Sequence, residues 1–135
     1  MDWKYVKELK DKDLVLSFLK SKGVKLPAEV IELIEMHNGG RPLRKCFDTN
    51  KHKECVFKSL LSYNPDDLET IYKVYKKGCD TNFIEMKLYP IALDPFGNFI
   101  CVDLKDGERI VLLRMETLDV ETVADNITLF VNSLY

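Results

Sequence analysis

The spacing of apolar residues predicts two helices near the N-terminus. Apolar positions recur with helical spacing over residues 2–22, with a break or a new start at residues 10–13 and a stop at Gly23. A second apolar stripe runs through Leu26–His37, and Pro27 suits the first turn because its missing N–H costs nothing there. The residues that follow are typical of a left-handed helix end: Asn38, Gly39 and Gly40.

Helical spacing also predicts two further helices. A turn at residues 64–67 leads into the third helix, for which Asp66 or Asp67 is the expected N-cap. The apolar face of this helix is expected to consist of Leu68, Ile71, Tyr72 and Tyr75. The last helix is expected over residues 120–134, with a buried stripe made of Val120, Val123, Ile127, Phe130, Val131 and Leu134.

Runs of β-branched and aromatic residues predict the strands between these helices. The expected strands are Lys45–Asp48, Cys55–Tyr63, Leu88–Leu93, Phe99–Leu104 and Arg109–Arg114. The turn at residues 94–98 has its own chemistry, because Pro95 presets φ and Gly97 can adopt a positive φ. Asp94 and Asn98 can bond the backbone of that turn, and Asp106-Gly107 is a hairpin signal before the last strand.

Strands grouped into hairpins, with helices between the groups, predict an α+β fold. We expect a bent antiparallel sheet packed by helices on one face, in the order ααββαβββα. The 135 residues suit a single domain covering residues 1–135, large enough to fold without a disulfide or a metal ion.

Charge is distributed unevenly along the chain. Residues 1–78 contain 16 Lys and Arg against 12 Asp and Glu, whereas residues 79–135 contain 4 against 10. The asymmetry fits either two solvated faces of opposite sign or an acidic surface that steers a basic protein partner. A sequence pI of about 5.7 argues against nucleic-acid binding, which usually needs a basic domain.

The chain carries no signal for export or membrane insertion. The N-terminal segment lacks the apolar region of a signal peptide, and the longest uninterrupted apolar runs, Phe99–Val102 and Ile110–Leu113, are four residues each. We therefore expect a cytoplasmic protein with reduced thiols and no membrane contact.

Three arrangements contain residue types that occur in catalytic or metal-binding centres. Cys46, His52 and Cys55 have ligand-like spacing for zinc, with Cys79 or His37 as a distant fourth ligand, but structural zinc sites usually contain a Cys-x-x-Cys pair. The same cysteines and histidines could form a catalytic pair, yet no nucleophile motif marks any of them. We expect the His37 ring to pack against apolar neighbours and to complement the dipole of its helix. We also expect that the protein binds no metal ion and no cofactor.

A pair of carboxylates for acid–base chemistry is the third arrangement. Asp94 and Asp103 close the two ends of one strand–turn–strand unit. General acid–base catalysis needs two carboxyl groups whose surroundings separate their pKa values. Asp94 is better interpreted as a turn residue that accepts bonds from backbone N–H groups, and Asp103 as a similar residue or part of the acidic surface.

Three landmarks resemble the SUKH superfamily in order and spacing. They are LPAEVIELIEMHNGG at Leu26–Gly40, YPIALDPFGNFICVD at Tyr89–Asp103 and ETVADNITLFVNSL at Glu121–Leu134. The second landmark is similar to the pattern "pIAxDxfGNxicxD" of that superfamily. The chain departs from the family at Met115-Glu116, where relatives often carry His-Glu.

The resemblance implies an α+β fold and a function without catalysis. Bacterial members look like immunity proteins that bind and neutralise toxins, often nucleases, and fungal relatives regulate cell-wall synthesis through protein partners. We therefore expect a toxin-binding protein, with a regulatory or scaffold module that binds a protein or a small ligand as the alternative. The oligomeric state can be monomer or homodimer, because unpaired edge strands of a small sheet can pair between two molecules.

The residues expected to contact the partner are the polar groups at the end of the sheet, taken to be exposed. They are Asp94, Asn98, Asp103, Asp106, Glu108 and Glu116. The residues expected to shape the turns are Asn38, Gly39, Gly40, Pro95 and Gly97.

Overall fold

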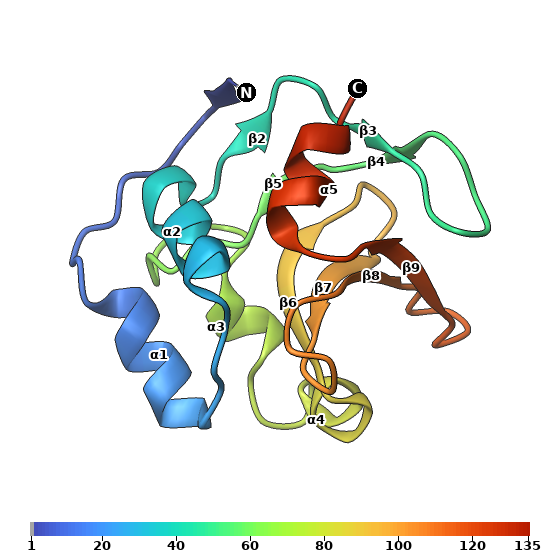
Figure 1. The fold of residues 1–135 in the computed structure, drawn as a ribbon. Coiled ribbons are helices and arrows are strands. Elements are labelled where there is room, and N and C mark those ends of the chain that lie inside the picture. Colours follow the sequence, from blue (N-terminus) through green and yellow to red (C-terminus); the bar gives the residue numbers. More distant parts are fainter. Residues whose placement is uncertain (1) are drawn as a thin grey trace.

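A computed structural model describes residues 2–135 (Figure 1). The helices are α1 (Leu14–Lys22), α2 (Ala28–His37), α3 (Ile71–Val74), α4 (Thr81–Met86) and α5 (Ile127–Ser133). The strands are β1 (Trp3–Lys4), β2 (Arg41–Pro42), β3 (Cys46–Phe47), β4 (Cys55–Val56), β5 (Ser59–Leu60), β6 (Leu88–Leu93), β7 (Phe99–Asp103), β8 (Ile110–Leu113) and β9 (Val120–Ala124). The α+β class is confirmed, although the structure contains more short strands, and one more helix, than the predicted order.

One antiparallel sheet of five strands forms the centre of the molecule, in the order β5-β6-β7-β8-β9. The pairing register shifts at Ile91 in β6 and at Val123 in β9, where one strand has an extra residue. Such bulges bend a strand and increase its twist. The strands β1–β2 and β3–β4 form two separate antiparallel pairs.

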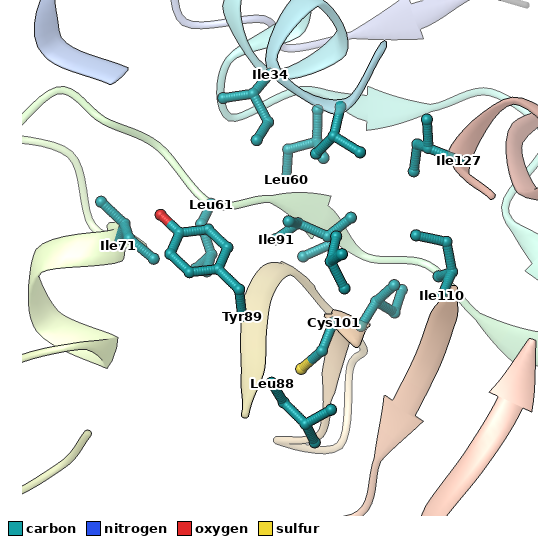
Figure 2. Close-up of a cluster of buried hydrophobic side chains, with 14 of the residues drawn as sticks. Ile34, Leu60, Leu61, Ile71, Leu88, Tyr89, Ile91, Cys101, Ile110 and Ile127 are labelled. Carbon is teal, nitrogen blue, oxygen red and sulfur yellow. The ribbon is translucent and has the colours of Figure 1, made fainter. Parts of the chain in front are cut away.

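The core lies where the helices meet this sheet. Figure 2 shows Ile34 of α2, Ile71 of α3 and Ile127 of α5 around the side chains of the sheet. All four residues of β8 are buried, so the centre of the sheet is covered on both faces. Residues 2–135 include no helix with the length and apolar composition needed to cross a bilayer.

The helix expected over residues 2–22 is wrong in its first half. Residues 2–10 form no helix, and Trp3 instead pairs with Pro42 across β1 and β2. The Trp3 ring stacks on His37 with centroids 4.9 Å apart, so the expected packing role of that histidine is present. These contacts come from residues distant in sequence, which is why they override local helical spacing.

The third helix begins later than expected. Thr70, rather than Asp66 or Asp67, caps α3, because its hydroxyl accepts the Lys73 N–H at 3.2 Å. Leu68 is 85% exposed and lies outside the helix, so its place on the apolar face is also wrong. The helix α4 was not predicted at all.

The first half of the expected last helix is a strand. Residues 120–124 form β9, and α5 begins only after Asn126, whose side chain accepts the Leu129 N–H at 2.9 Å. The β-branched residues of this segment favour a strand, and the helical stripe extended through them by coincidence of spacing. The expected strand Cys55–Tyr63 is likewise divided into β4 and β5.

Asn38 joins three segments that are far apart in sequence. Its Nδ2 donates to the Lys7 carbonyl at 2.8 Å and to Ser62 Oγ at 3.0 Å, and its Oδ1 accepts the Tyr63 N–H at 2.8 Å. The following Gly40 must lack a side chain, because a Cβ would lie 2.7 Å from the His37 carbonyl oxygen.

We predict that Asn38→Ala lowers the free energy of unfolding by about 3 kcal/mol, because it leaves several buried polar groups without partners. Urea denaturation measures the difference. The matched control is Asn132→Ala, which removes an exposed side chain of α5 and should change stability by less than about 0.5 kcal/mol. Equal effects of the two substitutions would contradict the role given to Asn38.

Candidate functional site

The structure divides the predicted contact residues between the two ends of the sheet. Successive turns of an antiparallel meander lie at alternate ends. Asp94 and Asn98, in the β6–β7 turn, therefore share an end with Glu116, in the β8–β9 turn. Asp103 and the β7–β8 turn at residues 104–109 lie at the other end. The expectation of one contact surface at one end of the sheet is wrong.

Asp94 is buried and occupied by its own turn, so its expected exposure is wrong. Its Oδ1 accepts the N–H groups of Phe96 and Asn98, both at 2.8 Å, and its Oδ2 accepts Asn98 Nδ2 at 2.9 Å. Asn98 Oδ1 accepts the Met115 N–H at 3.0 Å, which ties this turn to the β8–β9 turn. Gly97 has φ +85°, the conformation the turn requires.

At the other end of the sheet, two carboxylates are bonded within the chain and one is free of ion pairs within the described residues. Asp103 is buried, contrary to expectation, and accepts the Lys105 N–H at 3.0 Å. Asp106 accepts the N–H groups of Glu108 and Arg109, and these bonds lower the pKa of its carboxyl. The Glu108 side chain is exposed and has no salt bridge within residues 2–135.

Ion pairs within the chain engage two of the predicted contact carboxylates. Asp103 lies 3.7 Å from Lys105 Nζ, and Asp106 lies 3.5 Å from an Arg109 guanidinium nitrogen. Among the six predicted contact residues, the carboxylates that remain exposed and without an ion pair inside the described chain are Glu108 and Glu116.

A buried carboxylate that sequence reasoning missed lies on β9. Glu121 is 1% exposed and receives two bonds from Arg114, the shorter at 2.7 Å. Its Oε1 also accepts the Thr49 hydroxyl at 2.7 Å and lies 3.0 Å from His52 Nδ1. These contacts attach the β3–β4 loop, residues 48–54, to the sheet. The signal available was the β-branched composition around Glu121, which favours a strand over a helix.

Burial alone would raise the pKa of the Glu121 carboxyl. Hydrogen bonds from Arg114, Thr49 and His52 outweigh that effect and lower the pKa from 4.5 to about 2. A carboxyl with so low a pKa stays ionised at neutral pH, so it serves as a fixed acceptor that holds the loop.

The residues considered as zinc ligands do not converge. In the β3–β4 pair, Cys46 lies opposite Val56 and Cys55 opposite Phe47, so the two cysteine side chains point to opposite faces. His52 bonds Glu121 instead. No group of three or more His, Cys, Asp or Glu residues within 2–135 is placed to hold a metal ion.

Burial opposes nucleophile activation in two of the cysteines. Burial raises the pKa of Cys55 and of Cys101. A catalytic cysteine needs a lowered pKa, so that the thiolate forms at neutral pH.

A family model described as SMI1-KNR4 cell-wall, of the SUKH group, matches residues 18–131. The match covers the first two sequence landmarks entirely, the third as far as residue 131, and most of the chain. No curated protein and no solved structure shows a significant match.

We predict a pH-dependent contribution of Glu121 to stability. Because its pKa is lower in the folded protein than the ordinary 4.5, the contribution is fully present above about pH 4.5 and is lost as the pH falls toward 2. It amounts to roughly 2–3 kcal/mol. Urea denaturation of the parent chain and of Glu121→Gln should show a large difference at pH 6 that shrinks at pH 3.

The matched control for this experiment is Asp119→Asn, which removes one exposed negative charge from the same side of the sheet. A difference between the parent chain and Glu121→Gln that stays constant from pH 6 to pH 3 would refute the prediction.

Proposed function

Because this chain belongs to the SMI1-KNR4 cell-wall family of the SUKH superfamily, we propose that it is an immunity protein that neutralises a bacterial toxin by direct binding. The family match is the observation that carries the proposal. Bacterial members of the superfamily act in this way, without chemistry of their own. In this proposal the chain acts in the cytoplasm, as a single domain, without a cofactor, and contacts neither nucleic acid nor membrane.

The partner we propose is a toxin domain with a basic surface, of the nuclease type. Its expected contacts are Glu108 and Glu116, whose exposed carboxylates have no ion pair within residues 2–135. Unpaired surface charge raises the rate of association with an oppositely charged partner. The proposed role of Asp94, Asn98, Asp103 and Asp106 is to hold the turns that present this surface.

Glu108 and Glu116 are eight residues apart, which is at most about 25 Å even for a fully extended chain. A protein interface of standard size, about 800 Å² on each partner, can span such a distance. One toxin domain can therefore contact both ends of the sheet, or only one of them. Single substitutions distinguish these two arrangements, because only an end that touches the toxin responds to reversal of its charge.

The alternative function is a regulatory module that binds a cellular protein. The description of the matched family favours it, since the fungal regulators of cell-wall synthesis belong to this group. Such a module would also act through protein contacts, so the two functions differ in the partner and not in the kind of surface.

Co-expression tests the main proposal. The toxin domain encoded beside this gene is produced in a host with and without this chain, and complexes are recovered by pull-down. We expect survival only with the chain present, together with a stoichiometric complex. Loss of viability in both strains without a complex would reject immunity and favour the regulatory module.

We predict that Glu108→Lys and Glu116→Lys, tested singly and together, weaken toxin binding. The double variant should lose at least tenfold in affinity, about 1.4 kcal/mol, mainly through slower association. Surface plasmon resonance at low and high salt measures both rates. The matched control is Glu8→Lys with Glu32→Lys, which reverses two exposed charges elsewhere. Equal affinity of both double variants would refute the proposed contacts.

A further inference from the structure

A groove lies against β1, β2 and β5, and its larger cleft reaches Pro95 in the β6–β7 turn. Figure 1 shows β2 beside β1, with β5 close by. The groove consists of two clefts of about 330 Å³ and about 430 Å³, each within the usual range for binding sites. Tyr5 and Arg41 line both clefts, and the Arg41 guanidinium lies 5.8 Å from the centre of the Tyr5 ring. The two clefts are therefore compartments of one groove with a shared wall.

The lining of the groove is strongly cationic. Lys58 is held by Glu69, a carboxylate of the same lining, at 2.6 Å. The remaining lining cations have no salt bridge within residues 2–135: Lys4, Lys7, Arg41 and Lys45. The groove thus carries positive charge that the described chain does not neutralise, even though the protein as a whole has a net charge of −2.

Tyr5 is held in an unusual conformation at this groove. It has φ +56°, in the left-handed region that residues with a side chain rarely adopt. Pairing of β1 with β2 on one side, and the bond from the Lys7 N–H to the Asn38 carbonyl at 2.8 Å on the other, hold it there. The result is a Tyr side chain that is 70% exposed beside Arg41. Tyr and Arg are the residue types that contribute most often to binding energy at interfaces.

Apolar side chains complete the lining. Leu43 lines the larger cleft and Leu68 the smaller one, and both are exposed. An occupant that fits the groove therefore combines negative charge with apolar groups that cover Tyr5 and the leucines.

We propose that this groove binds an acidic, extended segment of a protein partner. Its carboxylates pair with Lys4, Arg41 and Lys45, and an apolar side chain of the segment packs on Tyr5. Arg41 supplies the planar fork that carboxylates match. A single-stranded nucleic acid fits less well, because successive bases stack on several aromatic side chains and Tyr5 is the aromatic ring exposed here. The proposal does not depend on toxin neutralisation.

Fluorescence anisotropy tests the proposal with a labelled peptide of alternating Glu and Leu residues. We expect saturable binding with a dissociation constant below about 1 mM at about 50 mM salt, and weaker binding at about 500 mM salt. A peptide of alternating Lys and Leu residues, and an oligothymidylate of similar length, are the control ligands. Absence of saturable binding of the acidic peptide, or tighter binding of the oligonucleotide, would overturn the proposal.

Two variants locate the binding in the groove. Lys4→Glu with Lys45→Glu should weaken peptide binding at least tenfold, whereas Lys12→Glu with Lys25→Glu, which reverses two exposed charges outside the groove, should leave it nearly unchanged. Tyr5→Gly removes the ring and suits the positive φ, so it should weaken binding while stability is kept or raised. Unchanged peptide affinity in both groove variants would overturn the assignment.

Discussion

The buried amide of Asn38 is the contact that sets the positions of the elements around it. It binds the N-terminal segment through Lys7 and the chain that leaves β5 through Ser62 and Tyr63. The adjoining Gly40 accepts the Leu60 N–H at 2.9 Å, which places β2 beside the edge of the sheet. An amide can serve such a junction because it donates and accepts at the same point, and burial makes each of these bonds costly to lose. The end of α2, the N-terminal segment that carries Lys7 and the chain that follows β5 are thus joined at one side chain.

The parts of the fold that were predicted correctly are those specified by local chemistry. The strand Leu88–Leu93 has the expected bounds, and β7 and β8 differ from expectation by one residue at their ends. Turn residues such as Gly97 and Gly107 specify these hairpins without help from distant segments, and both adopt a positive φ.

The errors occur where partners distant in sequence decide the conformation. Trp3 is extended because it pairs with β2 and stacks on His37, and β9 is a strand because β8 supplies its partner. Asp94, Asn98 and Asp106 lie in the turns predicted for them, but no local pattern showed that Asp94 and Asp103 are buried. Glu121 was missed because a charged residue gives no sign of burial until its cationic partner is brought to it by the fold.

Charge in this protein differs by segment and also gathers at particular places on the surface. In the acidic C-terminal part, Asp103, Asp106 and Glu121 form ion pairs with cations of the same part, and Glu108 and Glu116 stay exposed without one inside the described chain. In the basic N-terminal part, four cations without a salt bridge inside residues 2–135 line one groove. Two surfaces of opposite sign on one small chain allow two contacts with different chemistry. A partner that satisfies both would be recognised more selectively than one that matches net charge alone.

The β3–β4 loop also closes an edge of the sheet. The Asn50 N–H donates to the Thr122 carbonyl at 3.0 Å, and Asn50 Oδ1 accepts the Thr122 N–H at 3.0 Å. Asn50 thus occupies both backbone groups of Thr122 in β9, as a residue of a further strand would. Glu121 is one of the anchors of this loop, so protonation of its carboxylate would weaken the cover of this edge. Release of the loop would leave β9 open to pairing with a strand of another molecule, which is the usual beginning of aggregation in sheet proteins. The ion pair beneath the loop therefore protects solubility as well as shape.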